Sequence, residues 1–144
     1  MLLVMNRDWL AATAILLALA PPAAAQNAVE REVKAASGKE VRVGVYSDIR
    51  PDCTAGPLPA IRLVSPPAHG AVNVKRGTLK ITNYKQCLAT EVPAFIAIYR
   101  AADNFNGLDE FLLEIGMAGG RKQLQHFRVN VSATPGGGQG AQGI

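Results

Sequence analysis

Oxygen-bearing side chains gather in one short stretch of the sequence, residues 103–110. Asp103, Asn106 and Asp109 are spaced three residues apart within it, and clusters of carboxylate and amide oxygens are what Ca²⁺ prefers. The stretch does not place its glycine and glutamate where an EF-hand loop needs them. These three residues are therefore a candidate calcium site outside the EF-hand pattern.

The same stretch can also be a simple hairpin turn, and we favour this interpretation. Asn106 and Gly107 would supply the unusual φ angles of the turn, because asparagine and glycine tolerate them best. Asp109 would accept hydrogen bonds from backbone amides, and Phe105 would plug the edge of the core. The turn needs no metal, and we predict none.

Two histidines and two glutamates are the candidates for acid–base chemistry. His69 precedes a glycine in a predicted tight turn, and His126 is expected on the outer face of the last strand. Neither lies in the sequence context of a nucleophile, although the partners of a catalytic triad can be distant in sequence. Glu110 and Glu114 share a strand face, but a two-carboxylate mechanism needs a facing acid in a cleft. We predict a protein without catalytic residues or a cofactor.

Four arginines lie opposite the predicted core faces of their strands. They are Arg42, Arg62, Arg100 and Arg128. If their strands are neighbours, they form a basic patch that could bind an anionic glycan or lipid headgroup. If not, they are scattered charges that keep the protein soluble, and this is the interpretation we favour.

Residues 1–25 have the pattern of a secretory signal peptide. Arg7 lies in a short polar start, an apolar run covers 9–20, and an Ala-x-Ala sequence ends at Ala25. The run is shorter than the roughly 20 residues of a membrane-spanning helix, so an uncleaved anchor is the less favoured alternative. We predict a periplasmic or secreted protein, with the periplasm preferred, and no integral membrane segment after cleavage. Export and the lack of interleaved aromatic residues argue against nucleic acid as a partner.

The only cysteines of the chain are Cys53 and Cys87. In an exported protein, an even number of cysteines favours a disulfide. The alternatives are two free thiols or part of a metal site, but neither His69 nor His126 lies at ligand spacing from a cysteine. We therefore predict a Cys53–Cys87 disulfide.

The elements that must position these residues are short strands, since apolar and polar residues alternate in most segments between the predicted turns. The predicted strands cover residues 29–34, 41–45, 60–64, 71–74, 79–82, 94–100, 109–115 and 123–131. The valines of 41–45 are expected to face inward, and 94–100 has two apolar faces, which is typical of a central strand. Turns are predicted at 75–77 and at Gly70, where a positive φ is expected.

Seven or eight such strands without a convincing helix predict an all-β protein, specifically an antiparallel immunoglobulin-like β-sandwich. A small β-barrel is the alternative. The domain is expected to cover residues 26–133. The glycine-rich segment 134–144 is predicted to be a disordered tail because it cannot bury apolar surface.

A spaced set of residues between 60 and 131 resembles the bacterial immunoglobulin-like and cadherin-like repeat domains of exported and surface proteins. The matching residues are Pro67-x-His69-Gly70-x-Val72, Tyr99, Phe105-x-Gly107-x-Asp109-x-Phe111 and Val129-x-Val131. The chain departs from that pattern in having a single copy, Ala101 in place of the usual proline, the cysteine pair and a long insertion at 83–94. The resemblance implies a β-sandwich that acts as a spacer, an adhesive module or a ligand-binding module, and not as an enzyme.

Together these observations predict an exported, non-catalytic binding or structural module whose partner is a protein or an envelope glycan. One alternative is a small periplasmic inhibitor of a hydrolase that acts through a disulfide-anchored loop. A second alternative is a hydrolase with a dispersed site, which would need a deep pocket where His69 or His126 meets an acid and a hydroxyl.

Overall fold

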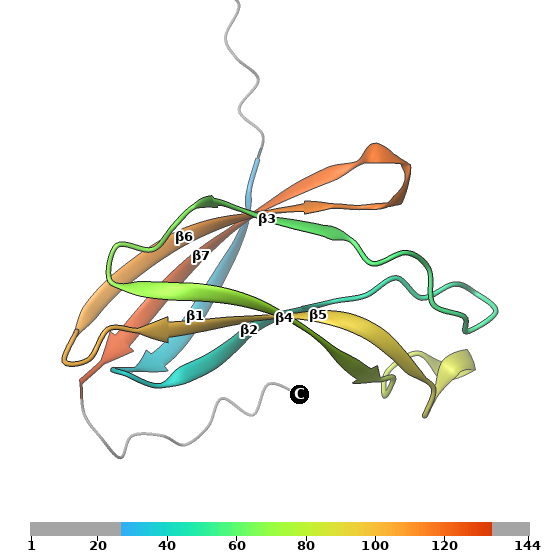
Figure 1. Ribbon diagram of the computed structural model, residues 1–144, viewed down its shortest axis with the longest axis horizontal. Coiled ribbons are helices and arrows are strands. Elements are labelled where there is room, and N and C mark those ends of the chain that lie inside the picture. Colours follow the sequence, from blue (N-terminus) through green and yellow to red (C-terminus); the bar gives the residue numbers. More distant parts are fainter. Residues whose placement is uncertain (1–26, 134–144) are drawn as a thin grey trace, which may run out of the picture.

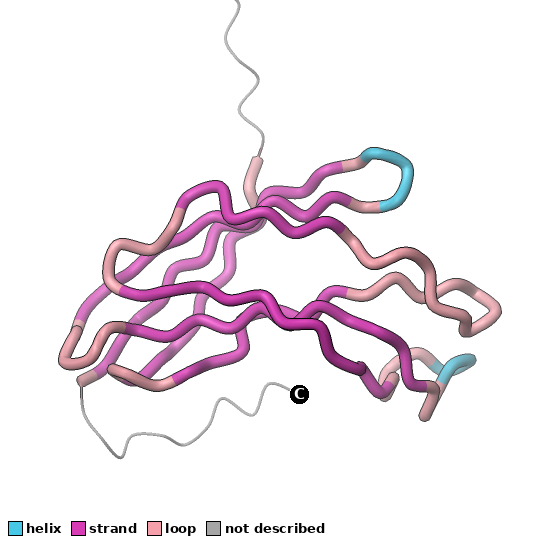
Figure 2. The backbone as a smooth tube through the Cα atoms, viewed as in Figure 1, coloured by secondary structure: helices cyan, strands magenta, loops and turns pink. Residues whose placement is uncertain are grey.

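The computed structural model describes residues 27–133 as seven β-strands in two sheets (Figure 1). The strands are β1 (Val29–Ala36), β2 (Glu40–Tyr46), β3 (Ala60–Ser65), β4 (Gly70–Lys80), β5 (Glu91–Ala101), β6 (Gly107–Gly116) and β7 (Lys122–Ser132). Two short 3₁₀ turns, η1 (Lys85–Cys87) and η2 (Ala118–Gly120), lie in connections between strands (Figure 2). The sheets do not close on each other, so the predicted all-β sandwich is confirmed and the barrel alternative is wrong.

Two predictions concern the ends of the chain. The signal peptide (1–25) and the glycine-rich tail (134–144) both lie outside the described residues. Within residues 27–133, no helix has the length and apolar composition needed to span a membrane.

The strand order is β1-β7-β6-β3 in one sheet and β2-β5-β4 in the other. One sheet holds β2, β4 and β5, and the other holds β3, β6 and β7. Immunoglobulin domains divide their strands in the same way, with B, D and E in one sheet and C, F and G in the other. β5 is the central strand of its sheet, as its two apolar faces predicted. One feature differs from the prediction: β1 and β7 pair in parallel, with Val29 opposite Gln125. The reason is that β1 does not form a hairpin with β2 but joins the opposite sheet, where its neighbour runs in the same direction.

The core lies between the sheets and is formed by alternate residues of β5 from one sheet and of β6 and β7 from the other. It contains Ala97, Tyr99, Ala101, Phe111, Leu113, Ile115, Phe127, Val129 and Val131, all 4% exposed or less. The rings of Tyr99, Phe111 and Phe127 are stacked, with centroid distances of 5.8 and 4.6 Å. The predicted outer position of His126 on β7 is confirmed, because Phe127, Val129 and Val131 on the opposite face of that strand are buried in the core. The aromatic stack joins the two sheets, since Tyr99 belongs to one sheet and Phe111 and Phe127 to the other.

Three local predictions are wrong. The turn predicted at 75–77 does not exist, because β4 runs through these residues and stays in register with β5. Gly77, which has no side chain, leaves room there for the side chain of Ile96. Val45 does not pack with the core, because a β-bulge at Val43 changes the alternation and Tyr46 faces the core instead. Gly70 does not have a positive φ.

Gly70 is instead required by a close approach of another strand. A Cβ atom at this position would lie 2.5 Å from the carbonyl oxygen of Arg100 and 2.7 Å from the ring of Tyr99. Neither a backbone carbonyl nor a fully buried ring can move away easily. The glycine therefore lets the connection between β3 and β4 cross directly over Tyr99.

A buried carboxylate holds that connection in place. Asp109, which is 2% exposed, accepts hydrogen bonds from the backbone amides of Ala68 (3.0 Å) and His69 (3.1 Å). It also accepts one from the hydroxyl of Tyr99 (2.7 Å) and one from the amide of Glu110 (3.0 Å). The four donors come from the β3–β4 connection, β5 and β6, so this carboxylate binds both sheets and the segment that passes between them.

The hairpin predicted at residues 103–110 is wrong, because β5 and β6 belong to different sheets and the turn between them crosses from one sheet to the other. Gly107 has a φ of 143° and Asn104 a φ of 63°, so Asn104 takes the role expected of Asn106. Phe105 packs against the core cluster and stacks on the ring of His69 at a centroid distance of 4.1 Å. The expected roles of Asp109 and Phe105 are thus confirmed.

Replacing Asp109 should destabilise the fold strongly. In the Asp109→Asn variant an NH₂ group would face donors, and at least one buried partner would lose its acceptor. We expect the free energy of unfolding to fall by about 2–4 kcal/mol in urea titrations. The exposed Asp103, 4.0 Å from Arg100, is the matched control, and Asp103→Asn should cost less than about 0.5 kcal/mol. Equal stability of the two variants would contradict a structural role for the Asp109 carboxylate.

The same site should make the fold sensitive to alkaline pH. Burial, the hydrogen bond to Asp109 and the negative charge of Asp109 raise the pKa of Tyr99. A pKa above its unfolded value of about 10 means that this stabilisation is complete below pH about 10 and is lost as the pH rises further. We expect the urea midpoint to fall between pH about 10 and about 11.5, and to fall less in Tyr99→Phe. Parallel curves for the two proteins would show that Tyr99 does not carry the effect.

Candidate functional site

Three connections meet at one end of the sandwich, which we call the loop end. They are the β2–β3 connection (47–59), the β4–β5 connection (81–90) and the β6–β7 turn (117–121). All three lie on the right in Figures 1 and 2, opposite the end that holds the Asp109 network. The loop end is the part of the described chain where irregular segments are longest.

A disulfide ties two of these connections together. Cys53 and Cys87 are bonded, with their Cα atoms 5.2 Å apart, which confirms the predicted pairing. Cys87 is 1% exposed and packs with Ile81 and Val92 in a small second core, onto which Ile49 also packs. The two connections are therefore fixed by a covalent bond and by burial of apolar side chains.

A cleft of about 330 Å³ opens between the sheets at the loop end. At its floor the hydroxyl of Tyr46 donates to Gln125 Oε1 (2.7 Å), and Gln125 Nε2 donates to Gln123 Oε1 (3.0 Å). Burial raises the pKa of Tyr46, while the positive charge of Arg31 opposes this, so the hydroxyl stays protonated near neutral pH. The floor is a chain of neutral hydrogen-bonding groups rather than a pair of titrating groups.

The walls of this cleft add one charge of each sign. Asp48 lies on the β2–β3 side and Arg121 on the β6–β7 side. Neither forms an ion pair with another residue of the described chain. Pro57, Pro59 and Ile115 supply apolar wall. The cleft can thus bind a mixed polar and apolar group, such as a side chain of another protein.

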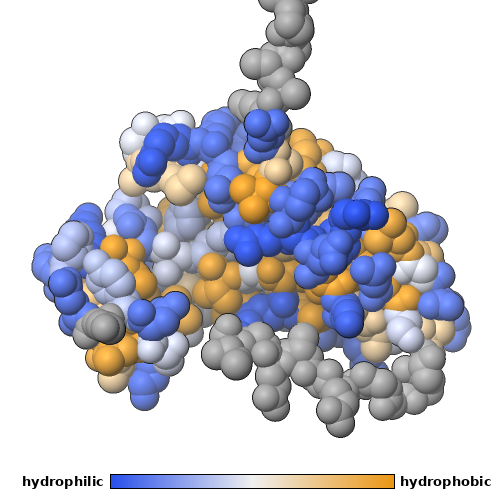
Figure 3. Space-filling view, turned by 180° about the vertical axis from the view of Figure 1, so that it is seen from behind, coloured by the Kyte–Doolittle hydropathy of each residue, from blue (hydrophilic) through white to orange (hydrophobic). Residues whose placement is uncertain are grey.

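Large apolar side chains are exposed at the loop end, and one of them, Met117, lines the cleft. Tyr84 is 44% exposed, Leu88 56% and Met117 37%, and they lie in or beside the three connections. On the face seen in Figure 3, hydrophobic areas are interrupted by hydrophilic residues.

The four predicted arginines are not brought together as one patch. Arg42 and Arg100 are on the three-stranded sheet, whereas Arg62 and Arg128 are on the four-stranded sheet. Three of them have acidic neighbours: Arg62 contacts Glu114 (3.3 Å), Arg128 contacts Glu110 (3.2 Å) and Arg100 contacts Asp103 (4.0 Å). Because strand order was unknown, the sequence could not decide between a patch and scattered charges.

Glu114 is the centre of a group of ion pairs on the outer face of the four-stranded sheet. It contacts Lys122 (3.2 Å) as well as Arg62, and both interactions lower its pKa. Surface pairs of this kind contribute little to stability.

The candidate calcium ligands also lie apart. The oxygens of Asp109 are occupied by the four donors described above, and Asp103 is exposed and faces Arg100. Within residues 27–133, no three His, Cys, Asp or Glu side chains are grouped so that they could hold a metal ion. Asp109 is therefore part of the buried hydrogen-bond network, whereas Asp103 lies at the surface of the connection between the two sheets.

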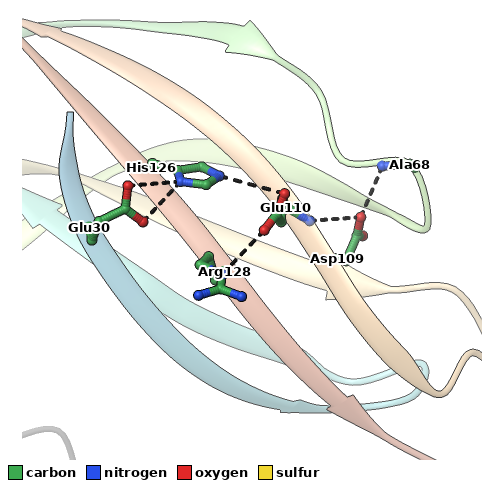
Figure 4. Close-up of polar contacts among 6 residues, drawn as sticks. All are labelled: Glu30, Ala68, Asp109, Glu110, His126 and Arg128. Atoms are coloured by element: carbon green, nitrogen blue, oxygen red, sulfur yellow. Dashed lines mark hydrogen bonds and ion pairs between the residues drawn. The ribbon is translucent and has the colours of Figure 1, made fainter. Parts of the chain in front are cut away.

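Neither histidine lies in a cleft. His126, on the outer face of β7, has Nδ1 2.9 and 3.0 Å from the carboxylate oxygens of Glu30 and Nε2 3.8 Å from Glu110 (Figure 4). Arg128 donates to the same Glu110, so the group is a surface network that links β1, β7 and β6. His69 is exposed and stacked on Phe105. No hydroxyl–histidine–acid arrangement is formed by either of them.

Sequence reasoning missed the cleft floor. The residue that could have indicated the cleft is Gln125, because it is a polar residue on the same face of β7 as the core residues Phe127, Val129 and Val131. A polar residue at a core position must find a hydrogen-bonding partner, and Tyr46 could not be identified as that partner without the bulge in β2.

Comparisons with known proteins add no family. No protein-family model matches the chain, and no curated protein matches it. Among solved structures, the chain is similar to the solution structure of amebosin, with 9% identity and a TM-score of 0.40 over 74% of this chain and 99% of that one. A TM-score this low carries no argument about function.

Loss of the disulfide should loosen the loop end. The bond closes a loop between residues 34 positions apart, which corresponds to about 3–4 kcal/mol in the chain-entropy model. We expect reductant to lower the urea midpoint of the wild-type protein, and the Cys53→Ser/Cys87→Ser variant to show the lowered midpoint without reductant. Reductant should not change the midpoint of that variant. An unchanged wild-type midpoint would contradict a stabilising role for the bond.

Proposed function

We propose that the protein is an exported, non-catalytic binding module that holds a protein partner at the loop end of its sandwich. The observation that carries the proposal is the Cys53–Cys87 bond between two connections of that end, beside a cleft and exposed apolar side chains. Connections that are held rigid before binding lose less conformational freedom on binding, which strengthens association.

The exposed side chains of the loop end suit a protein contact. Aromatic residues and methionine are enriched in protein interfaces, and tyrosine is common among the residues that contribute most binding energy. Tyr84 and Met117 provide these residue types, and Leu88 adds apolar area. Arg121 and Asp48 provide unpaired charges that can fix the orientation of the partner.

Export is supported by the redox state and by the N-terminal pattern. A structural disulfide persists in the periplasm or outside the cell, where thiols are not kept reduced. Both cysteines of the chain are used in it. Together with the signal-peptide pattern of residues 1–25, this favours a periplasmic or secreted protein.

A non-catalytic role is supported by the chemistry of the cleft. Its floor is two amides and a phenol, and neither His69 nor His126 lines it. A dispersed hydrolase site would bring one of those histidines to an acid and a hydroxyl in a pocket. The absence of both histidines from this cleft supports a binding role.

Inhibition of a hydrolase is a second candidate function, favoured by the shape of the β2–β3 connection. At its tip, residues 50–54, the amide of Arg50 donates to the carbonyl of Thr54 (2.9 Å) and the amide of Cys53 donates to the carbonyl of Arg50 (2.9 Å). The disulfide at Cys53 anchors this tip. Arg50, Pro51 and Asp52 are exposed there. A rigid exposed loop of this kind could occupy the active site of an enzyme in the same compartment.

Site-specific photo-crosslinking in exporting cells tests the proposal. A benzophenone amino acid at Tyr84 should form a crosslink to a defined protein, because this side chain would lie in the interface. The matched control is Leu108, which is also 44% exposed but lies on β6 at the opposite end. Equal crosslinking of the same protein from both positions, or none from Tyr84, would contradict binding at the loop end.

The same sample tests export and separates the two candidate functions. An intact mass that begins at Gln26, with no alkylation before reduction, is the expected result for an exported protein. If the crosslinked partner is a hydrolase, its activity should fall when the purified protein is added, and the Arg50→Ala variant, which changes the tip of the β2–β3 connection, should inhibit less. A partner whose activity is unchanged supports the binding module without inhibition.

A further inference from the structure

A second cleft lies on the side of the sandwich, where β1 and β2 leave the turn that joins them (36–39). The two strands belong to different sheets and diverge from this turn (Figure 1). Between them is a groove of about 520 Å³ that shares no lining residue with the loop-end cleft. The size is within the range of small-ligand sites. We call it the β1–β2 groove.

The β1–β2 groove is strongly basic. Arg31 and Lys34 line it from β1, and Arg42 lines it from β2. None of the three forms an ion pair with any residue in the described part of the chain. Glu32 is the one acidic residue among those that line the groove, so the formal charge of the lining is +3 − 1 = +2. By contrast, the other arginines of the predicted patch have acidic neighbours.

The local structure explains why the charges gather there. Arg31 is opposite Phe127 in the β1–β7 register, so it projects from the core-facing side of β1 at the open edge of the sandwich. The bulge at Val43 lies directly after Arg42 and bends β2 at this point. Val33, Val41 and Val43 form an apolar floor between the cations.

We propose that the β1–β2 groove binds a segment of an acidic polysaccharide through its carboxylate or sulfate groups. Arginine donates two parallel hydrogen bonds to such groups, and lysine adds a point charge. The valine floor suits the apolar faces of sugar rings, and the amide of Asn130, which also lines the groove, can bond to their hydroxyls. The groove is distinct from the loop end, so this proposal and the proposed function can fail separately.

Two other anionic partners fit the groove less well. Single-stranded nucleic acid is bound with the help of aromatic side chains on which bases stack, and no aromatic residue lines the groove. Binding to a membrane surface uses protruding apolar or basic side chains, whereas here the valines form the floor between flanking cations. A concave basic site with an apolar floor favours a flexible chain that can enter it.

The experiment measures binding of a fluorescent heparin-derived hexasaccharide to the protein purified from cells that express the full chain. Fluorescence anisotropy should show saturable binding that weakens as NaCl is raised, because salt screens charge contacts. Arg31→Gln/Lys34→Gln/Arg42→Gln should weaken binding about tenfold or more, since it removes all three cations of the groove. The charge-conserving Arg31→Lys/Arg42→Lys variant should retain part of the affinity.

A charge-matched control separates the groove from general attraction. Lys75, Arg76 and Lys80 are exposed on β4, at the far edge of the three-stranded sheet, and have no ion pair within the described residues. Their triple glutamine variant should change the affinity by less than about threefold. Thermal unfolding of each variant should match the wild type, because every changed residue is exposed.

Four results would overturn the proposal. One is equal weakening in both triple variants, which would show that net charge alone attracts the probe. A second is equally tight binding of neutral maltohexaose, and a third is no binding of the acidic hexasaccharide. The fourth is groove-dependent binding to vesicles of four parts phosphatidylcholine to one part phosphatidylglycerol without binding of the hexasaccharide, which would assign the groove to a lipid surface.

Discussion

The fold depends on one buried negative charge. Asp109 is a carboxylate in the interior of the protein, a position that is costly unless its oxygens are hydrogen-bonded. Here four donors from three segments surround it, and the segments come from both sheets and from the connection that crosses between them. Networks of this kind are favourable only when every member is present. The carboxylate therefore fixes where the β3–β4 connection crosses the sandwich.

The residues that resemble immunoglobulin-like and cadherin-like repeats converge on this charge. Gly70 makes room for the ring of Tyr99, His69 stacks on Phe105, and Asp109 binds the amides beside them. The spaced pattern thus corresponds to one packed network around Asp109, at the end of the sandwich opposite the loop end. This explains why it informs the fold, and why it contains none of the residues that form the loop-end cleft or the β1–β2 groove.

Most of the fold could be predicted because alternation with period two marks strands wherever one face is buried. Most strands from Val29 onward and the inward face of β7 were predicted in this way, and the disulfide was predicted from the pair of cysteines in a chain with a signal-peptide pattern. The failures have a common origin in long-range pairing. The Lys-Arg-Gly segment at 75–77 has the composition of a turn, but Gly77 is accommodated opposite β5 because it leaves space for Ile96. The candidate sites could not be predicted from the sequence. The cleft at Tyr46 and Gln125 and the groove at Arg31 and Arg42 both depend on strand order and on the bulge in β2, and the local sequence reveals neither.

The parallel pairing of β1 and β7 has a mechanical consequence. The first and last strands lie side by side and run in the same direction, with eight register pairs from Val29–Gln125 to Ala36–Ser132. A force that pulled the start of β1 away from the end of β7 would slide these strands along each other, so that all eight pairs resist together. A hairpin pulled from its open end would instead lose its pairs one after another. The pairing of the first and last described strands therefore resists tension applied along them.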